Sequence, residues 1–161
     1  MRAPMIVFAL ILGSFTPACA NRSDEVAETT GKTEPQTRMS PQDLEQLMQK
    51  IGPAYQELRK TLQGTDIVQA GKQAQQLGEL FGGVEKFWTQ YNKPDAIKWA
   101  GQARTHASET AGTAAAGNAA KATAAADNLG GVCKQCHSTY RESDGQGGYR
   151  IKAGVLSGTA N

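Results

Sequence analysis

Apolar residues recur at alternating steps of four and three along residues 40–142, the spacing of one buried helix face. The first such stretch begins at Ser40-Pro41, where a serine cap, a proline at the first helical position and Asp43 two residues later indicate a helix start. It ends near Gly64. Its apolar face consists of Leu44, Met48, Ile51, Tyr55, Leu58 and Leu62.

Three further stretches of this kind cover about residues 66–91, 95–117 and 118–142. The inward positions of the last two are mostly alanine, whereas the first two stretches carry the Leu, Ile, Phe and Trp residues. No segment shows the period-two alternation of a half-buried strand, so no strand is expected. The pattern therefore predicts an all-α protein, an antiparallel up-down-up-down four-helix bundle.

The first 20 residues have the pattern of an export signal. Arg2 precedes the apolar run Met5–Leu12, and Ala18-Cys19-Ala20 resembles a cleavage site. The run is too short to span a bilayer, which takes about 20 residues, so no transmembrane span is expected. A lipoprotein signal with a lipid anchor on Cys19 is the alternative that the sequence leaves open.

The rest of the chain divides by composition. Residues 21–39 are polar without an apolar period and are predicted to be a disordered linker. The expected organisation is a signal at 1–20, this linker, the bundle at 40–142 and a C-terminal tail at 143–161. An exported chain of this kind is expected in the periplasm. The formal net charge of +2 gives no reason to expect nucleic acid as a partner.

The fourth helical stretch contains Cys133-Lys134-Gln135-Cys136-His137. The C-x-x-C-H spacing is the signature of c-type haem attachment, in which two thiols bind the haem covalently and the histidine is an axial iron ligand. One covalently bound haem c is therefore expected, near the end of the fourth helix. The alternatives are a thiol redox pair, which usually lies in a βαβ setting, and a zinc site, which needs four ligands. His106 is the only other histidine and is expected to be a solvated helix residue.

No methionine follows Met48, so a methionine ligand on the other side of the iron must come from upstream. Met48 lies on the inward face of the first helix, although this spacing alone does not separate ligation from core packing. Met39 lies at the linker boundary and is a weaker candidate. Without either ligand the iron is five-coordinate. Arg141, one turn after His137, is expected beside the proximal haem face, or else is an ordinary basic residue at a helix C-terminus.

The segment Cys133–Arg141, ending the last helix of a four-helix bundle, resembles the cytochrome c′ family, the class II c-type cytochromes, over residues 40–142. In its low-spin, electron-transferring members the first helix supplies a Met followed closely by a Gly. Met48 and Gly52 are similar to that pair. The resemblance implies that Met48 is the distal iron ligand. Such members often carry an Arg four residues before the Met, where this chain has Leu44.

These observations predict an exported monohaem cytochrome that carries single electrons between redox partner proteins. The alternative is a five-coordinate cytochrome c′ that binds or senses NO or CO, with Met48 only lining the pocket. A third interpretation is a thiol or metal module without haem. The sequence shows no catalytic constellation beyond the motif, so no enzyme is expected. The resemblance leaves a homodimer open, because family members often pair through their first helices.

Overall fold

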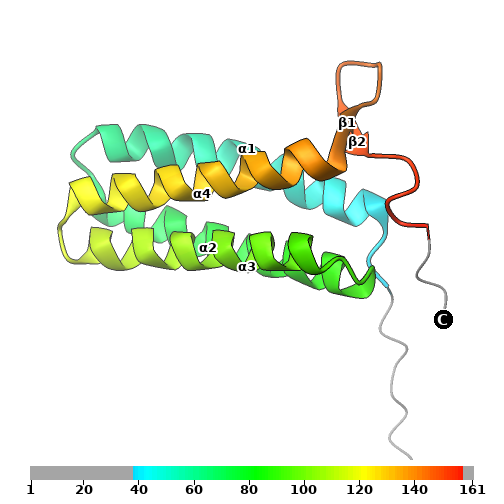
Figure 1. Cartoon of the computed structure of the whole chain (residues 1–161). Coiled ribbons are helices and arrows are strands. Elements are labelled where there is room, and N and C mark those ends of the chain that lie inside the picture. The colour runs from blue at the N-terminus through cyan, green and yellow to red at the C-terminus, as the bar shows by residue number, and fades with distance from the viewer. Residues whose placement is uncertain (1–37, 158–161) are drawn as a thin grey trace, which may run out of the picture. The chain divides into compact units, whose positions relative to one another are not determined.

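A computed structural model describes residues 38–157, which form four helices followed by two short strands (Figure 1). The helices are α1 (Pro41–Gln63), α2 (Ile67–Gln90), α3 (Pro94–Ala115) and α4 (Ala119–Tyr140). The strands are β1 (Arg141–Ser143) and β2 (Tyr149–Ile151). The prediction of a helical bundle is therefore confirmed. The proposed signal, most of the linker and Cys19 lie outside the described residues.

The start of α1 is fixed by a capping box. Ser40 Oγ accepts from the Asp43 backbone N–H at 3.2 Å, and Asp43 Oδ2 accepts from the Ser40 backbone N–H at 2.7 Å. Pro41 follows at the first helical position, where its missing N–H costs no helical hydrogen bond. The helix continues through the exposed Pro53. The sequence predicted this start correctly.

The core contains the apolar faces that the helical spacing predicts. Large side chains come from α1 and α2, among them Leu58, Leu77, Phe87 and Trp88, each at most 2% exposed. The buried residues of α3 and α4 are mostly alanine, which lets neighbouring helices approach closely. The buried alanines of these two helices are Ala96, Ala100, Ala103, Ala107, Ala111, Ala114, Ala122, Ala125 and Ala126.

Hydrogen bonds between distant residues show which helix ends lie together. The Met39 backbone N–H donates to Gln90 Oε1 at 2.7 Å, so the chain entering α1 lies beside the end of α2. Tyr140 Oη donates to Asp95 Oδ1, which places the end of α4 beside the start of α3. Farther along the bundle, Tyr55 Oη of α1 donates to the backbone carbonyl of Ala126 in α4 at 3.0 Å.

The two strands correct the expectation that the chain has none. Helix α4 ends at Tyr140, so Arg141 and Glu142, which were predicted to be helical, belong to β1. β1 and β2 pair antiparallel, with Glu142 opposite Arg150. Each strand has three residues, which is too short for a detectable alternation in the sequence.

The hairpin turn is held by one side chain. Asp144 Oδ1 accepts from the backbone N–H groups of Gln146 at 2.7 Å and Gly148 at 2.9 Å. Gly145 and Gly147 have φ angles of 78° and 91°, which glycine adopts without steric cost. The first half of the expected tail is therefore ordered as a hairpin directly after α4.

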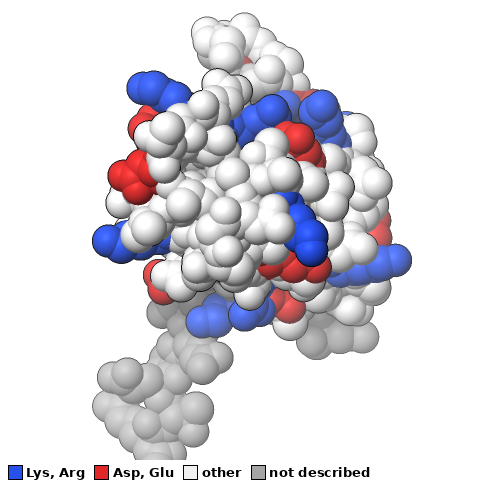
Figure 2. All heavy atoms as spheres, turned by 90° about the vertical axis from the view of Figure 1, so that its left-hand side faces the viewer, with Lys and Arg blue, Asp and Glu red and all other residues white. Residues whose placement is uncertain are grey.

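Charges of both signs are interspersed on the end of the bundle that faces the viewer in Figure 2. Ion pairs also join neighbouring helices: Arg59 of α1 lies 3.2 Å from Asp127 of α4, and Arg104 of α3 lies 2.6 Å from Glu85 of α2. These pairs are partly exposed, so each contributes little to stability. Among residues 38–157, no helix is long and apolar enough to cross a membrane.

Two adjacent glycines of α4 should respond in opposite ways to alanine. A Cβ on Gly130 would overlap with the Tyr55 hydroxyl, whereas a Cβ on Gly131 would meet nothing within 4 Å. We expect Gly130→Ala to lower the free energy of unfolding by about 1–3 kcal/mol, because Tyr55 must shift. Gly131→Ala should raise it by about 0.5–1 kcal/mol through helix propensity. Urea denaturation followed by circular dichroism measures both, and equal effects would contradict the packing of Tyr55 against α4.

Candidate functional site

All four helices contribute to a small apolar cavity of about 40 Å³. Cys133, Cys136 and His137 of α4 line it, and Met48 of α1 lines it as well. The structure thus brings together the motif and the methionine that the sequence analysis singled out. The remaining lining residues are Ile51, Phe81, Val84, Trp99, Ala100, Ala103 and Val132.

The motif reaches the cavity because it is helical. Positions separated by three and four residues lie on one helix face, so Cys133, Cys136 and His137 share a face. Leu129 and Val132, on the preceding turn, are 0% and 9% exposed and hold that face against the core. The three motif side chains are themselves half-buried. Each of them can therefore contact a molecule held inside the bundle.

Burial keeps both thiols protonated at neutral pH. It raises the pKa of Cys133 to about 11. The pKa of Cys136 is raised to about 12, mainly by burial and further by the negative charges of Cys133 and Asp95. Thiol redox pairs instead have a lowered pKa, because the thiolate is the reactive form. The site therefore lacks the electrostatics of a thiol redox pair.

The imidazole is in the form that binds a metal. Burial lowers the pKa of His137, and the positive charge of Arg141 lowers it further. A neutral imidazole leaves one ring nitrogen free to donate an electron pair to a metal ion. His137 can thus serve as an iron ligand in the physiological pH range.

Arg141 itself is directed toward the hairpin. Its guanidinium lies 3.8 Å from the centre of the Tyr149 ring, a cation–π contact, and its side chain does not line the cavity. It acts on His137 through its charge, at the end of α4. Its position beside the proximal face of a haem stays a prediction.

The second histidine lies apart from the motif. His106 of α3 does not line the cavity, and its Nδ1 lies 2.9 Å from Glu109 Oε2. A structural zinc site needs four converging ligands. Within residues 38–157, no three His, Cys, Asp or Glu side chains are placed to share a metal ion. The geometry therefore gives no support to a zinc site.

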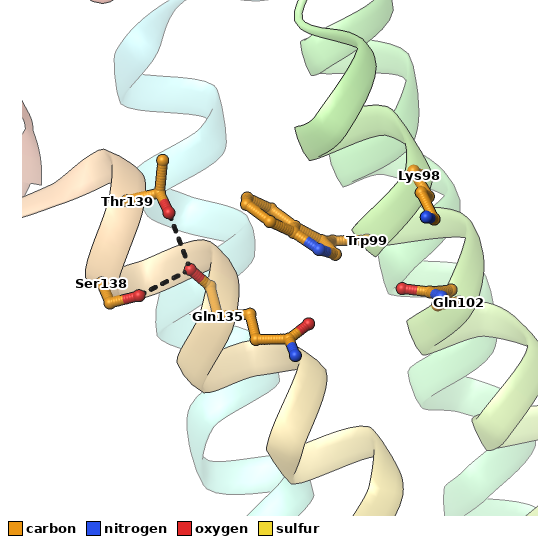
Figure 3. Close-up of a pocket in the computed structure, with 6 residues that line it drawn as sticks. All are labelled: Lys98, Trp99, Gln102, Gln135, Ser138 and Thr139. Carbon is orange, nitrogen blue, oxygen red and sulfur yellow. Dashed lines mark hydrogen bonds between the residues drawn. The ribbon is translucent and has the colours of Figure 1, made fainter.

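The donor set fits a c-type haem, but the cavity alone is too small for one. Pockets for ligands of that class usually enclose about 300–1,000 Å³. An open groove of about 500 Å³ lies next to the cavity, between α3 and α4 (Figure 3). Trp99 lines both spaces. The groove is lined by Lys98, Trp99, Gln102, Gln135, Ser138 and Thr139.

Comparison with known proteins gives no assignment: no protein-family model matches the chain, and no curated protein or solved structure matches it significantly. An assignment of function therefore rests on the cavity, its side chains and their chemistry.

The raised thiol pKa values predict slow alkylation of the folded, haem-free chain. With pKa values of about 11 and 12, only a very small fraction of Cys133 and Cys136 is thiolate at pH 7.5. We expect iodoacetamide to label both residues at least tenfold more slowly in buffer than in urea, with the rate still rising above pH 9. Mass spectrometry of the labelled peptides measures each site separately. Equal rates with and without urea would contradict the buried arrangement.

Proposed function

We propose that this chain is an exported monohaem c-type cytochrome that carries single electrons. The observation that carries the proposal is the shared cavity: the C-x-x-C-H residues of α4 and Met48 of α1 line the same small apolar space. The spacing of the motif suggests covalent haem, and the position of Met48 in the lining of the same cavity supports its role as a second iron ligand. Neither a thiol redox pair nor a zinc site would give Met48 a role.

The short turns between the helices support the bundle topology that the proposal requires. The turns at residues 64–66, 91–93 and 116–118 are short, and short turns favour antiparallel neighbours. The polar contacts also pair the start of α1 with the end of α2, and the end of α4 with the start of α3. We therefore propose the up-down-up-down order of a cytochrome c′-like bundle, with the haem attached near the end of α4.

Each motif residue has a defined role in this proposal. Cys133 and Cys136 would hold the haem through two thioether bonds, and His137 would bind its iron. Met48 of α1 would be the second iron ligand from the protein. The bound haem would supply the one-electron couple of its iron. Ligation of that iron by the thioether sulfur of Met48 would favour a high reduction potential.

The apolar walls of the cavity would also affect the reduction potential and the access of water to the iron. Ile51, Phe81 and Val84 are at most 5% exposed and would keep water from the iron. A site of low polarity disfavours the more highly charged oxidised iron, which also raises the potential. If His137 and Met48 both bind the iron, an incoming gas would have to displace Met48. This favours electron transfer over gas binding.

The proposal extends to the cellular setting. Export to the periplasm places the chain where bacterial c-type haem is attached, and redox proteins are the expected partners. Cleavage after residue 20, a lipid anchor on Cys19 and a homodimer stay predictions, because they depend on residues outside 38–157 or on a second copy. We propose a carrier and not an enzyme.

Covalent attachment is the first test. When the full chain is produced with a cytochrome c maturation system, we expect haem to stay on the polypeptide in a denaturing gel. Replacing both Cys133 and Cys136 with Ala should abolish that signal, because both thioether bonds are lost. Lys134→Ala, within the same motif, is the matched control and should retain the haem. A chain that never acquires covalent haem under these conditions would exclude the proposed function.

Ligation by Met48 is tested by replacing each of two methionines with alanine, one proposed to bind the iron and one not. We expect Met48→Ala to convert the ferric protein from low-spin to high-spin, because the iron loses its sixth ligand. Met39→Ala removes the same side chain at the start of α1, where Met39 only packs against the core, and should leave the spectrum unchanged. Electron paramagnetic resonance and optical absorption measure the spin state. A wild-type protein that is already high-spin and binds CO rapidly would favour the five-coordinate alternative.

A further inference from the structure

A haem in the cavity would bring negative charges that the apolar walls of the cavity cannot stabilise. Haem carries two propionate groups, which are ionised at neutral pH, and burying an unpaired carboxylate is costly. No lysine or arginine lines the cavity, and its one imidazole, His137, is assigned to the iron. On α1, Leu44 is 6% exposed in the core and supplies no charge either. The propionates must therefore leave the cavity.

The groove between α3 and α4 supplies polar partners directly outside. Figure 3 shows Lys98 and Gln102 on α3 on one side of the groove, and Gln135 on α4 on the other. The hydroxyls of Ser138 and Thr139 both donate to the Gln135 carbonyl, at 2.8 and 3.2 Å. The ammonium of Lys98 and the side-chain amides of Gln102 and Gln135 are the donors that face the groove.

Lys98 is available for an anionic partner. Among the described residues it forms no ion pair with a carboxylate. The acid one turn earlier on α3, Asp95, already accepts hydrogen bonds from Tyr140 Oη and from the Ala96 backbone N–H. An ammonium that pairs with a carboxylate forms a charge-assisted hydrogen bond, which is stronger than a neutral one.

One side chain separates the cavity from the groove. Trp99 lines both spaces, and its indole extends from α3 toward α4 (Figure 3). Its ring meets Tyr140 edge-on, with centroids 6.2 Å apart. Trp99 is half-buried, and a staggered rotamer that points toward solvent would take its indole out of the wall between the two spaces. If it does so, the 40 Å³ cavity and the 500 Å³ groove become one space.

We propose that the groove is the carboxylate-binding end of the haem site, that Trp99 moves aside when haem binds, and that Lys98 pairs with a haem propionate. This inference rests on the proposed function, since it concerns the same cofactor. It adds Lys98 as a residue that positions the haem and Trp99 as a side chain between the cavity and the groove. The motif alone reveals neither. It also places the polar edge of the haem at the surface between α3 and α4.

The Lys98 pairing is tested with two porphyrins that differ only in the carboxylates. Ferric protoporphyrin IX and its dimethyl ester are titrated into the haem-free full chain and followed by absorbance. We expect Lys98→Ala to weaken binding of the acid by about three- to tenfold, because one charged hydrogen bond is lost. Binding of the ester should not change. Lys134→Ala, an equal loss of charge on α4 outside the groove, is the control and should affect neither porphyrin.

The outcomes separate the two proposals. If Lys98→Ala weakens the acid and the ester equally, or neither, the pairing is wrong even where covalent haem attachment succeeds. If the chain acquires no covalent haem in the maturation host, the proposed function fails, whatever the porphyrin titration shows. A loss for the acid that is equally large in Lys134→Ala would indicate general charge attraction and would also overturn the pairing.

The role of Trp99 is tested by the rate of porphyrin entry. We expect Trp99→Ala to speed association severalfold in stopped-flow absorbance, because the partition is gone, and Trp99→Phe to give an intermediate rate. Circular dichroism of both variants checks that the bundle is intact. An association rate that is unchanged or lower in the folded alanine variant would overturn the assignment of Trp99 as the partition.

Discussion

Burial of one face of α4 is the constraint on which the rest of the structure depends. That face begins with Leu129 and Val132, which are packed into the core, and continues with Cys133, Cys136 and His137. The same helical spacing that packs α4 against its neighbours therefore directs two thiols and an imidazole into the bundle. The same face of α4 therefore packs against the core and lines the cavity, so a substitution on this face would change both the packing and the cavity.

That burial also determines the charge state of the site. It raises the pKa values of both thiols and lowers that of His137, so burial favours the neutral form of each of these three groups. On the proposed function, a cofactor in the cavity would meet apolar walls, and its charged substituents would have to face outward. The groove with Lys98 has polar side chains in its lining and shares Trp99 with the cavity. The apolar lining of the cavity and the polar lining of the groove would thus together determine where each part of a cofactor lies.

The sequence predicted the features that depend on local spacing. The four helices, the capping box at Ser40 and the inward position of Met48 all follow from residues a few positions apart. The hairpin did not, because its strands have three residues each and depend on the turn at Asp144. The dual position of Trp99 was also missed, since it depends on how closely α3 and α4 approach. The inward positions of α3 and α4 are mostly alanine, as the sequence predicted, but the alanines did not reveal that the cavity measures only about 40 Å³.

X-ray absorption at the iron K-edge of the purified full-chain protein tests the central claim most directly. The account predicts one iron per chain, with a shell of nitrogen neighbours and a single sulfur, because His137 and Met48 close the two sides of the haem. The two thioether sulfurs of Cys133 and Cys136 bind the porphyrin edge and lie outside the first shell. A first shell of nitrogen alone would contradict ligation by Met48, and a protein without iron would contradict the haem site itself.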